Sequence, residues 1–226
     1  MLRGKAPWNI RDVALVHFMR LAVGFIVVRF VYPLFFTASP PVVEVTDRLV
    51  VVGLVWFAVH RHGGTLASWG LAFARPVRNF AAGLGGGAVL LAVSLFTERI
   101  YTTVLFLSPT QHPLLAMVEQ AFSWRDLLLP LFLAGLAAPV AEEVLYRLFT
   151  FTALRDRFGL WGGAVLSAAI FALFHFNPYW LAEMVVVGVG LAVLYHWTGS
   201  LLASIAAHSF INTTKIAMLF YNVPLI

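Results

Sequence analysis

The chain has 226 residues, of which 61% are hydrophobic and 11% are charged, and its formal net charge is +5. This composition, with a mean hydropathy of +0.89, excludes an ordinary soluble domain and predicts a membrane protein. The Lys and Arg residues are spread over predicted loop ends rather than gathered on one face, so no nucleic-acid partner is expected. The absence of cysteine excludes disulfides, thiolate metal sites and a cysteine nucleophile.

Apolar stretches divide the chain into predicted helices, most of them close to the roughly 20 residues that a helix needs to cross the hydrocarbon. We place these helices at residues 13–36, 43–60, 80–96, 127–151, 162–176, 179–197 and 201–220. The second is the weakest, because Glu44, Asp47 and Arg48 lie in its first turns. The stretch 99–125 is expected to be a long loop with an interfacial helix.

The predicted fold is therefore all-α, a polytopic transmembrane bundle of about seven spans, with six to eight as the range. Residues 1–226 are expected to form a single integral membrane domain. The bundle should be held together partly by small residues that allow close helix contact. We expect this packing role for Gly83, Gly87, Gly162, Gly163, Gly188 and Gly190.

The basic residues favour a cytoplasmic N-terminus, because cytoplasmic segments are enriched in Lys and Arg. With this orientation the cytoplasmic segments hold Arg3, Lys5, Arg11, Arg61, Arg75, Arg78, Arg155 and Arg157. The external segments hold only Arg48, Arg99 and Arg125. We expect an integral protein of a prokaryotic plasma membrane.

Three ionisable residues lie together in the fourth predicted helix. Glu143 and Arg147 are four positions apart and share a helix face, so they can form an ion pair. Glu142 points about 100° away and does not need to share this partner. A buried ion pair that only fixes helix packing is the alternative interpretation of this group.

Two further predicted helices place polar residues at the same spacing. Phe171-x-x-x-His175 lies in the fifth helix and His208-x-x-x-Asn212 in the seventh. A single buried histidine is more often a packing residue than a catalyst, so convergence of the three helices decides between the two interpretations. At a rise of about 1.5 Å per residue, all of these side chains and Glu142 would lie about 12 to 19 Å below the cytoplasmic interface. Such an arrangement forms a pocket if the helices adjoin.

The remaining ionisable residues of the spans are expected to have structural roles. Glu183 and Lys215 would pair with neighbours or reach an interface, and His196 lies at the end of a span. Arg20 and Arg29 would reach an interface or a carbonyl group.

The motifs Glu142-Glu143-x-x-x-Arg147, Phe171-x-x-x-His175 and His208-x-x-x-Asn212 resemble, in order and spacing, those of the CPBP intramembrane proteases. This family includes type II CAAX prenyl proteases and bacterial Abi-like proteins. The resemblance covers residues 127–220, which would be the catalytic core.

The resemblance implies an intramembrane endopeptidase, and the preferred mechanism requires no cofactor. Glu142 would be the general base that activates water, with the help of His175. His208 and Asn212 would stabilise the oxyanion, and Glu143 and Arg147 would position the base. In an alternative mechanism, Glu142, His175 and His208 would bind zinc.

The expected partners are the lipid bilayer and a membrane-embedded or lipidated peptide or protein. A prenylated protein, a bacteriocin precursor, a peptide pheromone and a membrane regulator fit the sequence equally well, and the oligomeric state stays open. The main alternative to an endopeptidase is a transporter or scaffold, and another is an immunity protein with the same fold. The cluster of candidate site residues is confined to the C-terminal half, without the repeated halves that are typical of transporters.

Overall fold

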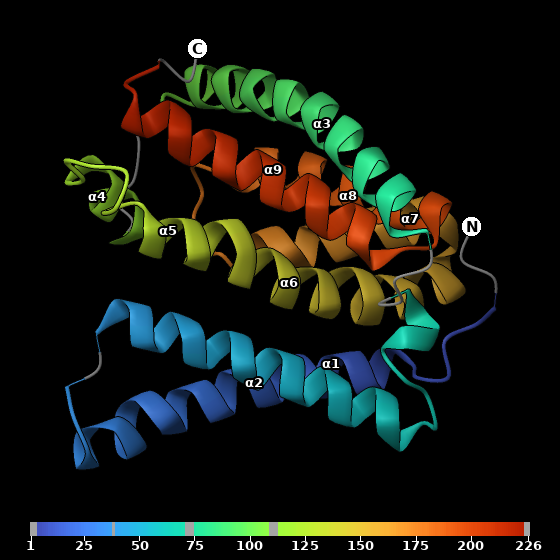
Figure 1. Ribbon diagram of the computed structural model, residues 1–226. Coiled ribbons are helices and arrows are strands. Elements are labelled where there is room, and N and C mark those ends of the chain that lie inside the picture. Colours follow the sequence, from blue (N-terminus) through green and yellow to red (C-terminus); the bar gives the residue numbers. More distant parts are fainter. Residues whose placement is uncertain (1–3, 38, 71–74, 109–112, 224–226) are drawn as a thin grey trace.

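The computed structural model describes residues 4–37, 39–70, 75–108 and 113–223, and the regular elements within these ranges are all helical. The helices in chain order are α1 (Ile10–Ile26), α2 (Pro40–Arg61), α3 (Pro76–Val104), α4 (Pro113–Glu119), α5 (Leu128–Phe132), α6 (Ala138–Glu142), α7 (Thr152–Leu173), α8 (Leu181–Thr198) and α9 (Leu201–Phe220). Figure 1 shows α1 and α2 as a pair on one side of the molecule, with the other long helices on the opposite side.

Several helical stretches within the described residues are long and apolar enough to cross a membrane. They are Ile10–Leu34, Pro76–Val104, Leu128–Leu173 and Leu181–Thr198. Their length and hydropathy are consistent with an integral membrane protein, and the described elements form the all-α fold that was predicted. In the first of them, α1 continues through the π-helical residues Val27–Val31 and the short 3₁₀ turn Tyr32–Leu34.

The gap between the predicted helices 127–151 and 162–176 is wrong, because the chain stays helical on both sides of a single break at Gly159. Gly159 has φ 75° and ψ 176°, a conformation that glycine adopts without a steric penalty. The chain reverses there, since the Ser167 hydroxyl donates to the Tyr146 carbonyl oxygen at 2.8 Å, 21 residues back along the chain. The stretch Leu128–Leu173 is therefore a hairpin. Beside the break, Arg155 pairs with Asp156 at 2.6 Å.

Two other predicted helices are longer than expected. α3 extends the predicted 80–96 to Pro76–Val104, and α2 extends 43–60 to Pro40–Arg61. The charges in the first turns of α2 do not end it, because Arg48 pairs with Glu44 and Asp47 pairs with Arg20 of α1. Part of the predicted loop at 99–125 is thus helix. α4 lies within it, and residues 109–112 lie outside the described residues.

Two stretches of the hairpin are wider than an α-helix. Leu133–Ala137 and Glu143–Phe151 are π-helical. Pro139 contributes to the first, because it has no N–H group to donate to the carbonyl of Gly135. Backbone carbonyls in these stretches accept from side chains instead, including the indole of Trp8, which donates to the Phe149 oxygen at 2.9 Å.

Glycines allow the close helix contacts that the sequence predicts. A Cβ atom on Gly83 of α3 would lie 2.5 Å from the Ala203 carbonyl oxygen of α9. A Cβ atom on Gly188 of α8 would lie 2.8 Å from the Ala168 Cβ of α7. The packing role of these glycines is confirmed.

One end of the bundle gathers the N-terminal segment and three turns, and we call it the amino-terminal end. The Ala6 N–H donates to Asp156 at 2.6 Å, next to the reversal at Gly159. The Leu201 N–H donates to the Gly70 carbonyl at 2.8 Å, which joins the α2–α3 loop to the start of α9. The opposite end holds α4 and the last turns of α9. In Figure 1 these two ends lie at the right and the left of the helices.

Candidate active site

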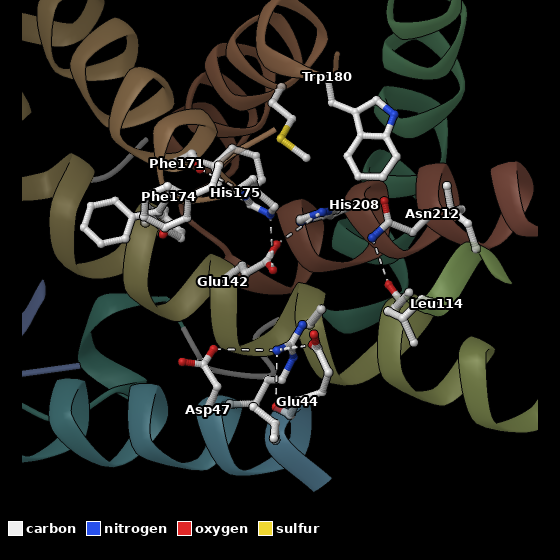
Figure 2. Close-up of a pocket in the computed structure, with 18 of the residues that line it drawn as sticks. Glu44, Asp47, Leu114, Glu142, Phe171, Phe174, His175, Trp180, His208 and Asn212 are labelled. Carbon is white, nitrogen blue, oxygen red and sulfur yellow. Dashed lines mark hydrogen bonds and ion pairs between the residues drawn. The ribbon is translucent and has the colours of Figure 1, made fainter. Parts of the chain in front are cut away.

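A cavity of about 800 Å³ lies between the α1–α2 pair and the helices α6 to α9. One wall carries Glu142, His175, His208 and Asn212, and Figure 2 shows these four side chains together. α2 forms part of the opposite wall with Glu44, Asp47 and Arg48. The carboxylates that line the cavity outnumber the Lys and Arg side chains by six to three, so the cavity is acidic although the chain is basic.

Glu142 lies between the two histidines. Its Oε1 atom is 3.8 Å from His175 Nε2, and its Oε2 atom is 3.7 Å from His208 Nε2 (Figure 2). The side chain of Glu142 is 18% exposed and that of His175 is 27% exposed, so both can be reached from the cavity. The structure thus brings α6, the end of α7 and α9 to one point.

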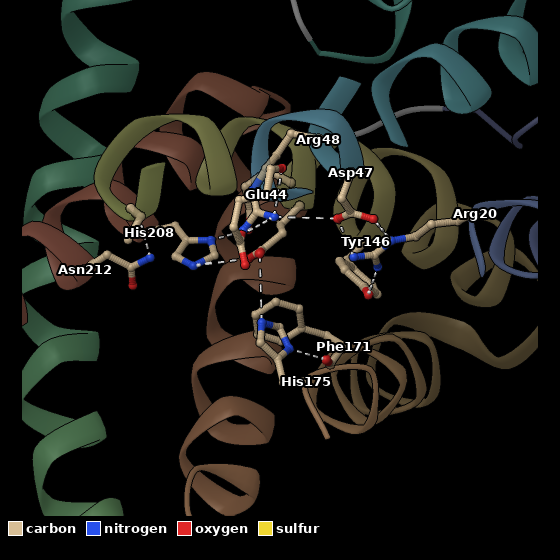
Figure 3. A network of polar contacts seen from close by, with 12 residues as sticks. Arg20, Glu44, Asp47, Arg48, Tyr146, Phe171, His175, His208 and Asn212 are labelled. Carbon is tan, nitrogen blue, oxygen red and sulfur yellow. Dashed lines mark hydrogen bonds and ion pairs between the residues drawn. The ribbon is translucent and has the colours of Figure 1, made fainter. Parts of the chain in front are cut away.

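The orientation of His175 is fixed by its own helix. Its Nδ1 atom lies 2.7 Å from the carbonyl oxygen of Phe171, one turn earlier (Figure 3). Because a carbonyl oxygen only accepts, Nδ1 carries the proton in this bond. When the ring is neutral, the nitrogen that faces Glu142 is therefore an unprotonated Nε2.

Glu143 has a different environment from its neighbour in sequence. It is fully buried, its Oε1 atom lies 2.9 Å from His208 Nδ1, and its Oε2 atom lies 3.2 Å from Arg147 Nε. The predicted pair of Glu143 and Arg147 is present, and His208 is an additional partner. Glu142 thus faces the cavity while Glu143 supports the ring behind it.

Asn212 lies one turn after His208 on α9, at the wall of the cavity. Its Nδ2 atom donates to the Ala134 carbonyl at 2.8 Å, in the π-helical stretch before Glu142. This bond uses one of the two hydrogens on the amide nitrogen and fixes the orientation of the side chain.

Part of the cavity wall was not predicted to lie near the site. Arg20 was expected to reach an interface or a carbonyl, and this expectation is wrong. Its guanidinium binds Asp47 at 2.9 and 2.7 Å and the Tyr146 hydroxyl at 3.1 Å (Figure 3). The only signal in the sequence was a pair of opposite charges in the first two predicted helices.

A second polar cluster lines the cavity beyond Asn212. Lys215 Nζ lies 2.8 Å from both Glu98 of α3 and Glu183 of α8, and Ser94 donates to Glu183 at 2.7 Å. Glu183 and Lys215 were expected to pair with neighbours or reach an interface, whereas Glu98 and Ser94 were not singled out. The cluster connects α3, α8 and α9 at one level of the bundle.

The positions of Glu142, His175 and His208 can be compared with those of the ligands in a zinc site. Zinc bonds of 2.0 to 2.1 Å in a tetrahedron place the donor atoms about 3.3 Å apart. The separations from Glu142 to the two imidazoles are a few tenths of an ångström longer. Within the described ranges, no set of three His, Cys, Asp or Glu side chains is arranged to hold a metal ion.

Residues 124–214 match the family model described as "Rce1-like: Type II CAAX prenyl endopeptidase Rce1-like". The match confirms over these residues the family that the three motifs indicate, and it contains all six predicted site residues. No curated protein and no solved structure matches the chain.

Proposed function

We propose that this chain, whose residues 124–214 match the type II CAAX prenyl endopeptidase family model, is an intramembrane endopeptidase in which Glu142 activates the attacking water. The observation that supports this most directly is the Glu142 carboxylate between two imidazole nitrogens, at 3.8 and 3.7 Å, on the wall of a cavity. Residues 127–220 would be the catalytic core of a single integral membrane domain.

The spacing around Glu142 suits one water molecule. Two polar atoms 3.7 to 3.8 Å apart are too distant for a direct hydrogen bond, yet a water molecule beside them can reach both at about 2.8 Å. In the proposed reaction Glu142 takes a proton from this water, helped by the unprotonated Nε2 of His175. The water oxygen then bonds to the substrate carbonyl carbon, and the carbonyl oxygen becomes an oxyanion.

Two donors on α9 would stabilise the oxyanion. Asn212 keeps one N–H hydrogen after its bond to Ala134, and His208 donates from Nε2 in its imidazolium form. The Glu143 carboxylate at Nδ1 stabilises that form, and Arg147 holds the carboxylate in place. When the intermediate collapses, the C–N bond breaks and the leaving amine takes the proton from Glu142. No covalent intermediate with the protein is needed.

A zinc-dependent version of the same reaction is the second proposal, and one observation favours it. Both Nδ1 atoms are hydrogen-bonded to oxygen, which is typical of histidines that bind a metal through Nε2. Glu142, His175 and His208 would then hold the ion, which would polarise the carbonyl and the water. Activity that survives chelation, with no metal found by elemental analysis, would eliminate this version.

For the topology we propose seven spans with a cytoplasmic N-terminus in a prokaryotic plasma membrane. The reversal at Gly159 turns the 46-residue stretch Leu128–Leu173 into two passes. With α2 and α9 beside the other candidate spans, the number of passes reaches seven. The basic residues support the orientation.

The test of the proposed function is substrate trapping with Glu142→Gln, which keeps the shape of the side chain and removes the base. We expect the variant to retain full-length substrate in the membrane, and mass spectrometry of wild-type cells to identify the cut bond. Asp126→Asn is the matched control, because this carboxyl group lies on the surface before α5 and outside the cavity. Unaltered cleavage by Glu142→Gln would eliminate Glu142 as the base.

A further inference from the structure

The residues that line the cavity all lie away from the amino-terminal end of the bundle. α1 contributes only residues from Arg20 onward, and α9 only residues from His208 onward. α2 runs in the opposite direction, and its contribution ends at Val50, so residues 51–61 do not reach the cavity. The lining residues farthest from that end belong to α4, the α7–α8 loop and the last turns of α9, and we call this part of the cavity its mouth.

A dense apolar core closes the amino-terminal end. The Trp8 side chain is 2% exposed and stacks on Phe149 with 5.2 Å between ring centroids. Val55, Val59 and Leu201 belong to the same buried cluster. A peptide could approach Glu142 from this end only by displacing these side chains.

The basic residues identify the side of the membrane on which each end lies. Of the described Lys and Arg residues, those in or next to the loops at the amino-terminal end are Lys5, Arg11, Arg61, Arg75, Arg78, Arg155 and Arg157. Near the opposite end lie Arg29, Arg99 and Arg125, while Arg48 is paired with Glu44 at the cavity wall. The excess of positive charge places the amino-terminal end in the cytoplasm.

We infer that the active site opens to the non-cytoplasmic side of the membrane and receives its substrate from there. The substrate is then a peptide segment that lies in the outer leaflet or enters it from outside. A secreted peptide precursor and the external juxtamembrane segment of a membrane protein have this placement. A lipidated tail at the cytoplasmic surface would instead meet the closed end. The catalytic part of this inference rests on the proposed function, whereas the direction of access does not.

The absence of cysteine makes the direction of access measurable, because one introduced thiol is the only thiol in the chain. Phe176 lines the cavity mouth and is 80% exposed, and Ser68 is exposed in the α2–α3 loop at the amino-terminal end. A membrane-impermeant maleimide added to intact spheroplasts should label Phe176→Cys and leave Ser68→Cys unlabelled. Both should be labelled after permeabilisation.

Labelling of Ser68→Cys in intact spheroplasts, or labelling of Phe176→Cys only after permeabilisation, would overturn the inference. Leu115→Cys, on α4 at the same mouth, replaces Phe176→Cys if that variant does not fold. The Glu142→Gln substitution separates the two proposals. In a Phe176→Cys background it should abolish cleavage and leave the labelling pattern unchanged. Persistent cleavage would contradict the proposed function alone.

Discussion

The ring of Phe171 lies over the guanidinium group of Arg147, with 4.7 Å between Arg147 Cζ and the ring centroid. The same ring lies 4.7 Å from the imidazole of His175, and the Phe171 carbonyl accepts the His175 Nδ1 proton at 2.7 Å. One residue of α7 thus contacts both the cation that holds Glu143 and the ring that faces Glu142. This contact explains the aromatic residue in the Phe171-x-x-x-His175 motif.

Phe171→Leu should lower both stability and activity. The substitution keeps the backbone bond to His175 and removes a desolvated cation–π contact, which is worth about 2 kcal/mol. Thermal unfolding in detergent should show a lower Tm than for the wild type. Leu173→Ala is the control, because that side chain is exposed on the same helix and its loss should change Tm less. Equal effects of the two substitutions would count against the contact.

Arg147→Met should destabilise the protein more severely. It leaves the buried Glu143 carboxylate without its cation, and breaking such a pair costs about 3 to 5 kcal/mol. The double variant Glu143→Gln/Arg147→Met should recover much of the lost Tm, since no unpaired charge remains. A double variant that is less stable than Arg147→Met would contradict this account.

His208→Gln should reduce kcat by about 10²- to 10³-fold, the usual effect of removing one oxyanion donor, with little change in KM. The protein should remain folded, because glutamine retains a hydrogen-bond donor near Glu143. The measurement is cleavage of the trapped substrate in detergent or liposomes. A loss confined to KM would assign His208 to substrate binding instead.

Gly83→Ala should weaken the contact between α3 and α9. Its Cβ atom would lie 2.5 Å from the Ala203 carbonyl oxygen, and relieving such overlap costs about 1 to 3 kcal/mol. Gly85→Ala on the same helix is the matched control, because no heavy atom lies within 4 Å of the added Cβ. Alanine stabilises a helix by about 1 kcal/mol over glycine, so Tm should fall for Gly83→Ala and stay level or rise for Gly85→Ala.

Helix bounds could be predicted well where hydropathy and turn residues coincide. α9 begins and ends at the predicted residues, Leu201 and Phe220. Its start could be predicted because Gly199 and Ser200 separate it from α8. The prediction was wrong at residues 152–161, which lie between two predicted helices, with Arg155 and Arg157 assigned to a cytoplasmic segment. Charges mark where a chain leaves the hydrocarbon, but a helix can continue beyond that point, and only Gly159 breaks it.

In the candidate site, the helical spacing of residues was enough to predict contacts within one helix, but it could not predict contacts between helices. The i,i+4 spacing predicted the pair of Glu143 and Arg147. Spacing cannot show that His208, 65 residues away, binds Glu143, or that Arg20 binds Asp47 across the cavity from the histidines. Such contacts depend on how the helices rotate and tilt against one another, which a single sequence does not specify.

The α1–α2 pair lies outside residues 124–214, yet it forms one wall of the cavity and is tied to Tyr146 through Arg20. If this pair were removed, acyl chains would cover Glu142 and replace the water that hydrolysis consumes. A carboxylate exposed to hydrocarbon costs several kcal/mol, so the shortened protein would hold that group protonated and inert. The segment that carries all three motifs therefore depends on the first two helices to keep the Glu142 carboxylate hydrated.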